Sequence, residues 1–187
     1  KDLCTLPFVE RLLDAGIVSL KIEGRNRSPE YVSAATRAYR EVVDAYLGLD
    51  GEDSKEALAT LKQTHLERIN RVYHRGYSSG HFMGQPIDAW TESGHSQAST
   101  RKAYVGVVTN YYARPGVAEV RIQDSAISLG DSVLFLGPTT GIVEQVLESM
   151  QVDHGAVDKA SKGMDVAIKT PEPVRRNDKL YVVVDQE

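Results

Sequence analysis

The spacing of apolar residues predicts helices in the first part of this chain and strands in the last part. Up to about Tyr73, apolar residues recur every three or four positions, as in amphipathic helices. The predicted helices cover residues 5–16, 28–46 and 54–72. Between the first two, residues 19–22 alternate polar and apolar side chains, which predicts a strand with one face on a core.

From Arg101 onward the pattern changes to short runs rich in β-branched residues, separated by turn residues such as Arg114-Pro115-Gly116. Regularly spaced strands of this kind favour a small closed antiparallel barrel. The predicted strands are Tyr104–Thr109, Ala118–Ile122, Ser132–Phe135, Val143–Met150, Val166–Lys169 and Leu180–Val184.

A stretch rich in glycine, serine and histidine lies between the helices and the strands and is typical of a linker or an ordered loop. The pattern therefore predicts three parts. Residues 1–75 are the helical part, residues 76–100 the linker or loop, and residues 101–187 the barrel.

Composition narrows the classes of function. The 187 residues carry a net charge of −4, so no overall basic field announces a nucleic-acid partner, and RNA binding would depend on local arginine clusters. A single cysteine excludes an internal disulfide and suits a reducing compartment, which favours a cytoplasmic location. No apolar run is long enough to span a membrane.

The most informative chemistry lies at Glu23-Gly24-Arg25, where opposite charges flank a glycine just after the predicted strand. Strand ends that precede helices are the usual place for binding chemistry in α/β folds. We therefore consider Glu23 and Arg25 as candidate catalytic residues, with a structural ion pair as the alternative. Lys21 and Arg27 are candidate substrate-binding residues beside them.

The block SLKIEGRNRSPEY at residues 19–31 resembles the signature of the collagenase-like peptidase family U32, which carries KIEGR-x-x-SPEY near the end of a barrel-like catalytic domain. Residues 1–4, KDLC, are similar to another segment of that family, and residues 75–80, RGYSSG, to its RG[FY][ST]-x-G motif. The resemblance implies that residues 1–75 hold the last β/α unit of a TIM-like barrel. It also implies that the missing N-terminal part of this domain belongs to a longer parent protein.

The same resemblance implies two classes of activity for the parent protein. The family name implies a peptidase, whereas other members are implicated in oxygen-independent hydroxylation of RNA bases or of a quinone precursor, with an iron–sulfur cluster. In those members the cysteine of the KDLC segment is a cluster ligand, so Cys4 is a candidate ligand in the full-length parent only. This fragment would hold no cofactor by itself.

The barrel sequence is similar to the second domain of translation elongation factors, in its V-G-x-V strand at residues 105–108 and its I-x-x-G-D turn at residues 127–131. Such barrels bind or position other molecules more often than they catalyse reactions. Together with the family resemblance, this similarity makes RNA, or alternatively a protein or peptide, the expected partner.

Other candidate residues have simpler explanations. The histidines lack the spacing of metal ligands, and no serine or cysteine has the neighbours of an activated nucleophile. Arg68, Arg71 and Arg75 lie near Tyr73 and Tyr77 and suit RNA contact, although the acidic net charge favours a solvated helix face as the explanation. We therefore expect a fragment that is non-catalytic alone, carrying a barrel that binds or positions substrate.

Overall fold

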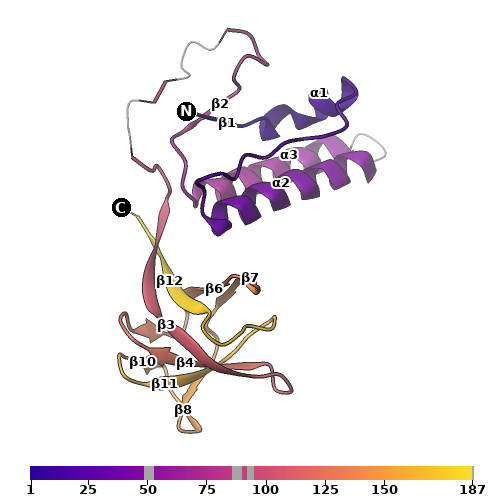
Figure 1. Cartoon of the computed structure of the whole chain (residues 1–187). Coiled ribbons are helices and arrows are strands. Elements are labelled where there is room, and N and C mark those ends of the chain that lie inside the picture. Colours follow the sequence, from indigo (N-terminus) through magenta and orange to yellow (C-terminus); the bar gives the residue numbers. More distant parts are fainter. Residues whose placement is uncertain (49–52, 86–89, 92–94, 187) are drawn as a thin grey trace. The chain divides into compact units, whose positions relative to one another are not determined.

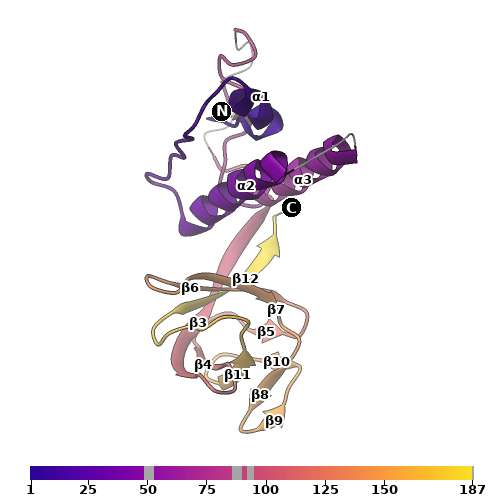
Figure 2. The same ribbon diagram turned by 90° about the vertical axis from the view of Figure 1, so that its right-hand side faces the viewer.

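The computed structural model describes residues 1–48, 53–85, 90–91 and 95–186. The chain divides into two compact units, Lys1–Ser99 and Thr100–Glu187, and each is described by itself. The first unit is mainly helical and the second is built from strands, as Figures 1 and 2 show.

In its described residues the first unit contains three helices, one 3-10 turn and two short strands. Its elements in chain order are β1 (Asp2–Leu3), η1 (Leu6–Phe8), α1 (Val9–Asp14), α2 (Pro29–Gly48), α3 (Asp53–Asn70) and β2 (Tyr77–Ser78). Strands β1 and β2 pair in parallel, with Asp2 opposite Tyr77, so the two ends of the unit's sequence lie side by side.

Helices α2 and α3 lie side by side and bury one face each (Figure 1). The Ser28 hydroxyl accepts a hydrogen bond from the Tyr31 backbone N–H at 3.3 Å and caps α2, as the sequence predicts. Buried residues from the two helices and from the N-terminal segment then form one core, made of Cys4, Leu6, Val9, Ala38, Val42, Leu58 and Ile69.

The predicted strand at residues 19–22 is wrong: residues 17–24 lie in no helix or strand. Lys21 is exposed, and Leu20 and Ile22 are only partly buried. A strand is stabilised by pairing, and in the described part of the first unit β1 and β2 pair with each other and not with this segment. Alternation of side chains is therefore insufficient without a neighbouring strand.

The stretch between the helices and the barrel is partly ordered by backbone hydrogen bonds. The Gln97 N–H donates to the His74 carbonyl at 2.8 Å, and the Ser99 N–H donates to the Asn70 carbonyl at 2.9 Å. The chain thus returns to the end of α3 before β3 begins. Part of the predicted linker, residues 86–89 and 92–94, lies outside the described residues.

The second unit consists of ten strands in its described part, and turns separate most of them where the sequence predicts. The strands are β3 (Thr100–Tyr112), β4 (Val117–Ile122), β5 (Ile127–Ser128), β6 (Ser132–Gly137), β7 (Gly141–Val146), β8 (Met150–Val152), β9 (Gly155–Ala156), β10 (Lys159–Ala160), β11 (Asp165–Lys169) and β12 (Lys179–Asp185). The predicted strand over residues 143–150 is in fact two strands, β7 and β8, because residues 147–149 leave the ladder.

Eight of these strands form one curled antiparallel sheet in the order β7-β6-β12-β3-β4-β11-β8-β9 (Figure 2). Alternate residues of most of the longer strands point inward, so the sheet encloses a single apolar core. That core comprises Val105, Val108, Ala118, Val120, Ile122, Ile127, Val133, Phe135, Val143, Leu147, Met150, Ala160, Val166, Ile168, Val174, Leu180 and Val182.

The eight-stranded sheet does not close on itself through a continuous ladder of hydrogen bonds. Strands β7 and β9 are the two ends of the eight-stranded order, and the segment at residues 127–131 lies across the gap. On one side β5 pairs with β10, and on the other the Gly130 N–H donates to the Leu147 carbonyl at 2.8 Å. The Leu147 N–H in turn donates to the Asp131 carbonyl at 2.9 Å. We call this seam, residues 127–131 with Leu147 and β10, the barrel seam.

Candidate functional site

The predicted catalytic residues lie in an exposed turn at residues 23–27. The Glu23 carboxylate accepts a hydrogen bond from the Arg25 backbone N–H at 2.6 Å, so it stabilises the turn itself. Both side chains are exposed, as is Lys21. The Arg27 N–H closes the turn by donating to the Gly24 carbonyl at 3.0 Å. The turn therefore presents the Arg25 guanidinium to solvent.

Gly24 fits a close approach of the turn to α2. A Cβ atom at this position would lie 3.0 Å from Cγ2 of Val32, which is tighter than ordinary van der Waals contact. Within this chain its small size serves the contact with Val32.

Arg27 is the predicted site residue that the structure connects to other groups. Its guanidinium donates to Oδ1 of Asp2 at 2.7 Å and is only 15% exposed. The guanidinium carbon also lies 5.0 Å from the ring centroid of Tyr31 and 5.1 Å from that of Tyr73. Arg27 is thus held by one carboxylate and two aromatic rings.

Asp2 joins a second arginine to the same group. Its Oδ2 accepts from the Arg75 backbone N–H at 3.1 Å, and its Oδ1 accepts from the Arg75 guanidinium at 3.2 Å. Asp2 is 9% exposed, whereas the Arg75 side chain is 47% exposed. We call Asp2, Arg27, Tyr31, Tyr73 and Arg75 the Arg27 cluster. It combines two positive charges with one negative charge.

These contacts set the protonation state of Asp2. Burial alone would raise the pKa of its carboxyl, but the hydrogen bonds from Arg75 and the charge of Arg27 outweigh burial and hold the pKa below its usual range. The carboxylate is therefore ionised at neutral pH and remains the anchor for both arginines.

A stacked pair of rings supports the cluster from β2. The His74 and Tyr77 rings are nearly parallel, with centroids 4.6 Å apart. The buried His74 accepts a hydrogen bond at Nδ1 from the Gly76 N–H at 3.0 Å. Burial lowers the pKa of this imidazole, although the Asp2 charge opposes the change. His74 is therefore neutral at physiological pH and adds no positive charge.

Cys4 lies next to the cluster, in the core of the first unit. It is 8% exposed, and burial raises the pKa of its thiol, although a hydrogen bond involving Tyr39 opposes the rise. The Tyr39 hydroxyl also accepts a hydrogen bond from the Thr5 backbone N–H at 2.9 Å. Within this chain the thiol is protonated at neutral pH and packs as a small apolar group.

The cluster unites the three segments that carry the family resemblance. Asp2 comes from KDLC, Arg27 and Tyr31 come from the signature block, and Arg75 comes from RGYSSG. Sequence reasoning gave Asp2 no role and treated Arg75 as part of a helical stripe. Helix α3 ends at Asn70, so Arg71 and Arg75 lie beyond it and no single stripe forms. The signal that could have found Asp2 is its place in a motif segment.

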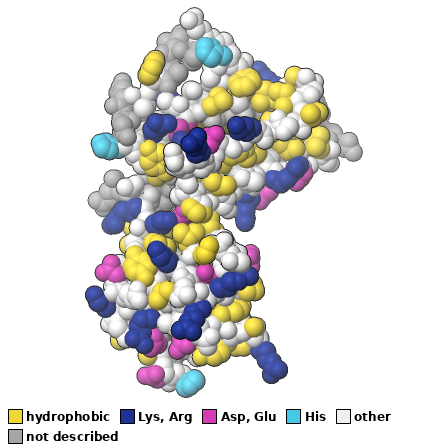
Figure 3. All heavy atoms as spheres, in the orientation of Figure 1, with side chains coloured by type: hydrophobic (Ala, Val, Ile, Leu, Met, Phe, Trp, Pro, Cys, Tyr) yellow, Lys and Arg dark blue, Asp and Glu magenta, His cyan; other side chains and the backbone are white. Residues whose placement is uncertain are grey.

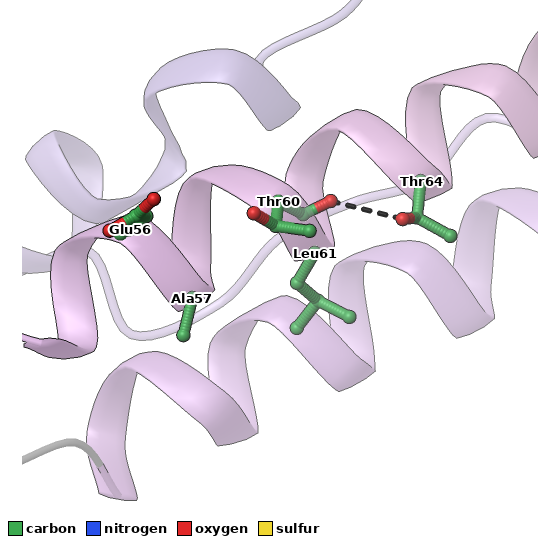
Figure 4. Close-up of a pocket in the computed structure, with 5 residues that line it drawn as sticks. All are labelled: Glu56, Ala57, Thr60, Leu61 and Thr64. Atoms are coloured by element: carbon green, nitrogen blue, oxygen red, sulfur yellow. Dashed lines mark hydrogen bonds between the residues drawn. The ribbon is translucent and has the colours of Figure 1, made fainter.

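The remaining surface offers few alternatives in the part of the chain that is described. An open hollow on α3, which none of the predicted site residues lines, is drawn in Figure 4 and is lined by Glu56, Ala57, Thr60, Leu61 and Thr64. The described side chains contain no group of three or more potential metal ligands. Basic and acidic side chains are interspersed over the face in Figure 3. Among the described helices, none is long and apolar enough to cross a membrane.

Comparisons with known proteins identify the family. Residues 1–92 match the sequence profile of peptidase family U32. The chain is 39% identical to a collagenase of Porphyromonas gingivalis over 97% of its own length and 42% of that protein. It is 32% identical to tRNA hydroxylation protein P of Escherichia coli, over 92% of this chain and 36% of that protein.

A solved structure also aligns with part of this chain. The C-terminal domain of a protein assigned to the U32 peptidases, from Geobacillus thermoleovorans, aligns with a TM-score of 0.40 and 26% identity, over 42% of this chain and 90% of that domain. The chain spans less than half the length of the curated relatives it matches, among them two collagenases of Porphyromonas gingivalis. From the match over residues 1–92 and these relatives, we conclude that the chain belongs to peptidase family U32.

Proposed function

We propose that this chain binds and positions RNA for a longer U32 family protein that modifies RNA, and that the Arg27 cluster contacts the RNA backbone. The observation that carries the proposal is the pair of arginines held by Asp2, one of which, Arg27, also contacts two tyrosine rings. Arginine forks bind phosphate through paired hydrogen bonds, and exposed aromatic rings stack on bases. Relatives named tRNA hydroxylation protein P support the choice of RNA.

The charges of the cluster suit an anion. One carboxylate serves two guanidinium groups, which leaves an excess of one positive charge at a partly buried position. Arg75 is 47% exposed and Tyr73 is 41% exposed, so both remain accessible to a ligand. A phosphate would approach Arg75, while Arg27 stays fixed by Asp2 and the two rings.

Binding of a fluorescently labelled transfer RNA, measured by anisotropy over a range of salt concentrations, tests the proposal. We expect Arg75→Ala to weaken binding and to lower the salt dependence by about one phosphate contact. Arg75→Lys should restore part of the salt dependence, because it keeps the charge but loses the fork. The matched control is Arg40→Ala, which removes an exposed arginine paired with Asp44 on α2. Equal effects of the two alanine variants, or no binding by the unaltered chain, would contradict the proposal.

A peptidase is the second candidate, because the collagenase of Porphyromonas gingivalis is 39% identical over 97% of this chain. In this case too we propose that the chain alone is catalytically silent, since no nucleophile with an activating base was found in its sequence. Purified chain should leave gelatin and short peptides intact on prolonged incubation. Cleavage that persists after a further purification step and that is insensitive to chelators would overturn this expectation.

The role of Cys4 remains a proposal about the longer protein. Iron–sulfur clusters need several thiolates in convergent positions, and this chain has one cysteine, which is buried and protonated. The residues of this chain alone therefore do not fit such a cluster. Cys4 would act as one ligand only if the rest of the protein supplied the others and opened the thiol to them.

We further propose separate roles for the exposed turn at residues 23–27 and for each of the two units. Arg25, oriented by the Glu23 turn, is available to bind an anionic group of a substrate, with Lys21 nearby in sequence. The first unit would be the last part of a TIM-like catalytic domain, and the second a positioning barrel of the elongation-factor type. Replacing Arg25 by Ala in the full-length protein should abolish activity and leave the melting temperature unchanged.

A further inference from the structure

The outer face of the barrel carries an aromatic pair that the proposed function does not yet use. Strands β3 and β12 are antiparallel, with Tyr104 opposite Tyr181 and Lys102 opposite Val183. The neighbouring residues Val105 and Val182 point into the core. Because side chains alternate along a strand, Tyr104 and Tyr181 lie on the outer face, and both are partly exposed.

The two rings are held in a fixed arrangement. Their centroids are 5.6 Å apart and their planes meet at 65°, the edge-to-face geometry that aromatic pairs prefer. The Tyr104 hydroxyl donates to Oε1 of Gln123 at 2.6 Å, which fixes the orientation of that ring. Nζ of Lys102 lies 4.9 Å from the Tyr181 centroid. A ligand that stacks here would therefore meet rings that are already ordered.

Basic side chains lie on one side of the tyrosine pair, and an acidic side chain lies near Tyr104 on the other. Lys102 and its neighbour Arg101 are exposed on β3. On the Tyr104 side, burial, Tyr181 and the Asp124 carboxylate together raise the pKa of the Tyr104 hydroxyl. An anionic group would therefore lie toward Lys102 and Arg101 and away from Asp124.

We propose that Tyr104 and Tyr181 form a stacking site for an unpaired base of RNA, whose phosphate is bound by Lys102. This inference rests on the proposed RNA-binding function and adds a second point of contact on the other unit. A base that stacks on tyrosine contributes more to binding than an exposed cation–π contact. The base would therefore displace the Lys102 ammonium group from the ring, and the ammonium group would then contact the phosphate. Paired bases have no free face, so single-stranded RNA is the expected ligand.

The test measures binding of a labelled, unstructured ten-nucleotide oligouridylate to the whole chain by anisotropy. We expect Tyr181→Leu to weaken binding about ten-fold, within the range for the loss of one stacked base. Tyr181→Phe should bind as the unaltered chain does, because it keeps the ring. Tyr112→Leu is the matched control, since Tyr112 is a 48% exposed tyrosine at the far end of the same strand.

Each outcome decides the proposal. If Tyr181→Leu binds the oligonucleotide normally, while Arg75→Ala still weakens transfer RNA binding, the stacking site is wrong and the proposed function stands. If the chain binds neither RNA, both fail. Should Tyr181→Leu lose its cooperative melt, Lys102→Gln replaces it. That variant must lower the salt dependence by about one phosphate contact, and an unchanged salt dependence would also refute the site.

Discussion

At the scale of single residues, Asp2 connects parts of the first unit that lie far apart in the sequence. It is a short side chain on a two-residue strand, yet it contacts arginines 25 and 73 positions away in the sequence. The charge, the backbone hydrogen bond and the burial of this carboxylate all depend on one another. Its removal should therefore affect the first unit more than the loss of any exposed ion pair.

We predict that Asp2→Asn destabilises the first unit by about 3 kcal/mol, the usual effect of breaking a largely buried ion pair. Because the pKa of Asp2 is lowered by folding, the unfolded state binds more protons below about pH 4, and the contribution of Asp2 is lost as the pH falls through that range. Urea unfolding followed by circular dichroism measures both effects. Asp44→Asn, which alters an exposed pair, is the control and should change the free energy of unfolding by less than about 1 kcal/mol.

Gly106 is a second important residue, because the neighbouring strand leaves no room for a side chain there. It lies on β3 beside β4, and a Cβ atom there would overlap the backbone carbonyl of Arg121. Backbone cannot move aside as the end of a flexible side chain can, so the strands would have to separate locally.

We therefore predict that Gly106→Ala destabilises the barrel by about 3 kcal/mol, at the upper end of the range for overpacking. Gly155→Ala is the control, because its added Cβ would lie 3.4 Å from the Val152 carbonyl oxygen, an ordinary contact. Denaturant unfolding of both variants gives the comparison. Equal stability of the two would mean that β3 and β4 have more freedom than their register indicates.

At the scale of elements, predictions from the sequence succeeded where they depend on residues that are close together in the chain. The start of α2 was predictable because Ser28 and Pro29 act within one turn, and most of the longer barrel strands were predictable because turn residues bound them. The two-residue strands β5, β9 and β10 were not predicted. The segment at residues 19–22 has the alternation of a strand but forms none, since a strand depends on a partner that its own residues do not encode.

The Arg27 cluster could not be predicted from the sequence, because it too depends on partners that are distant in the chain. Asp2 meets Arg75 only because β1 pairs with β2, and no spacing rule connects residues so far apart. The motif segments were visible in the sequence, and Arg27 was considered as a binding residue. Their convergence on a single carboxylate emerged only from the structure.

At the scale of the whole molecule, each unit has its own core. The buried residues of the barrel come only from the second unit, and those of the helical core only from the first. We therefore expect the strands of the second unit to fold without help from the first unit.

We predict that residues 100–187 fold alone. Expressed without the first unit, they should give dispersed amide resonances and a cooperative thermal transition. The whole chain should then show two transitions, and Asp2→Asn should move only the one that loses helical signal. A collapsed, poorly dispersed spectrum of the isolated segment would mean that the barrel needs the helices.

The barrel seam has a further consequence for motion. In the described sheet each inner strand is held by a ladder on both sides. Across the seam the ends are joined by the short β5–β10 pairing, by the bond from the Leu129 N–H to the Asp158 carbonyl and by the two bonds at Leu147. The Gln145 side chain on β7 adds one bond to the Lys169 carbonyl on β11. Local opening should begin where the fewest bonds must break. In hydrogen exchange, the amides of Gly130 and Leu147 should therefore lose protection well before those of Val120 and Val166 at the centre of the β4–β11 ladder. The barrel would thus open transiently along the seam, while the ladders on the opposite side of the barrel stay paired.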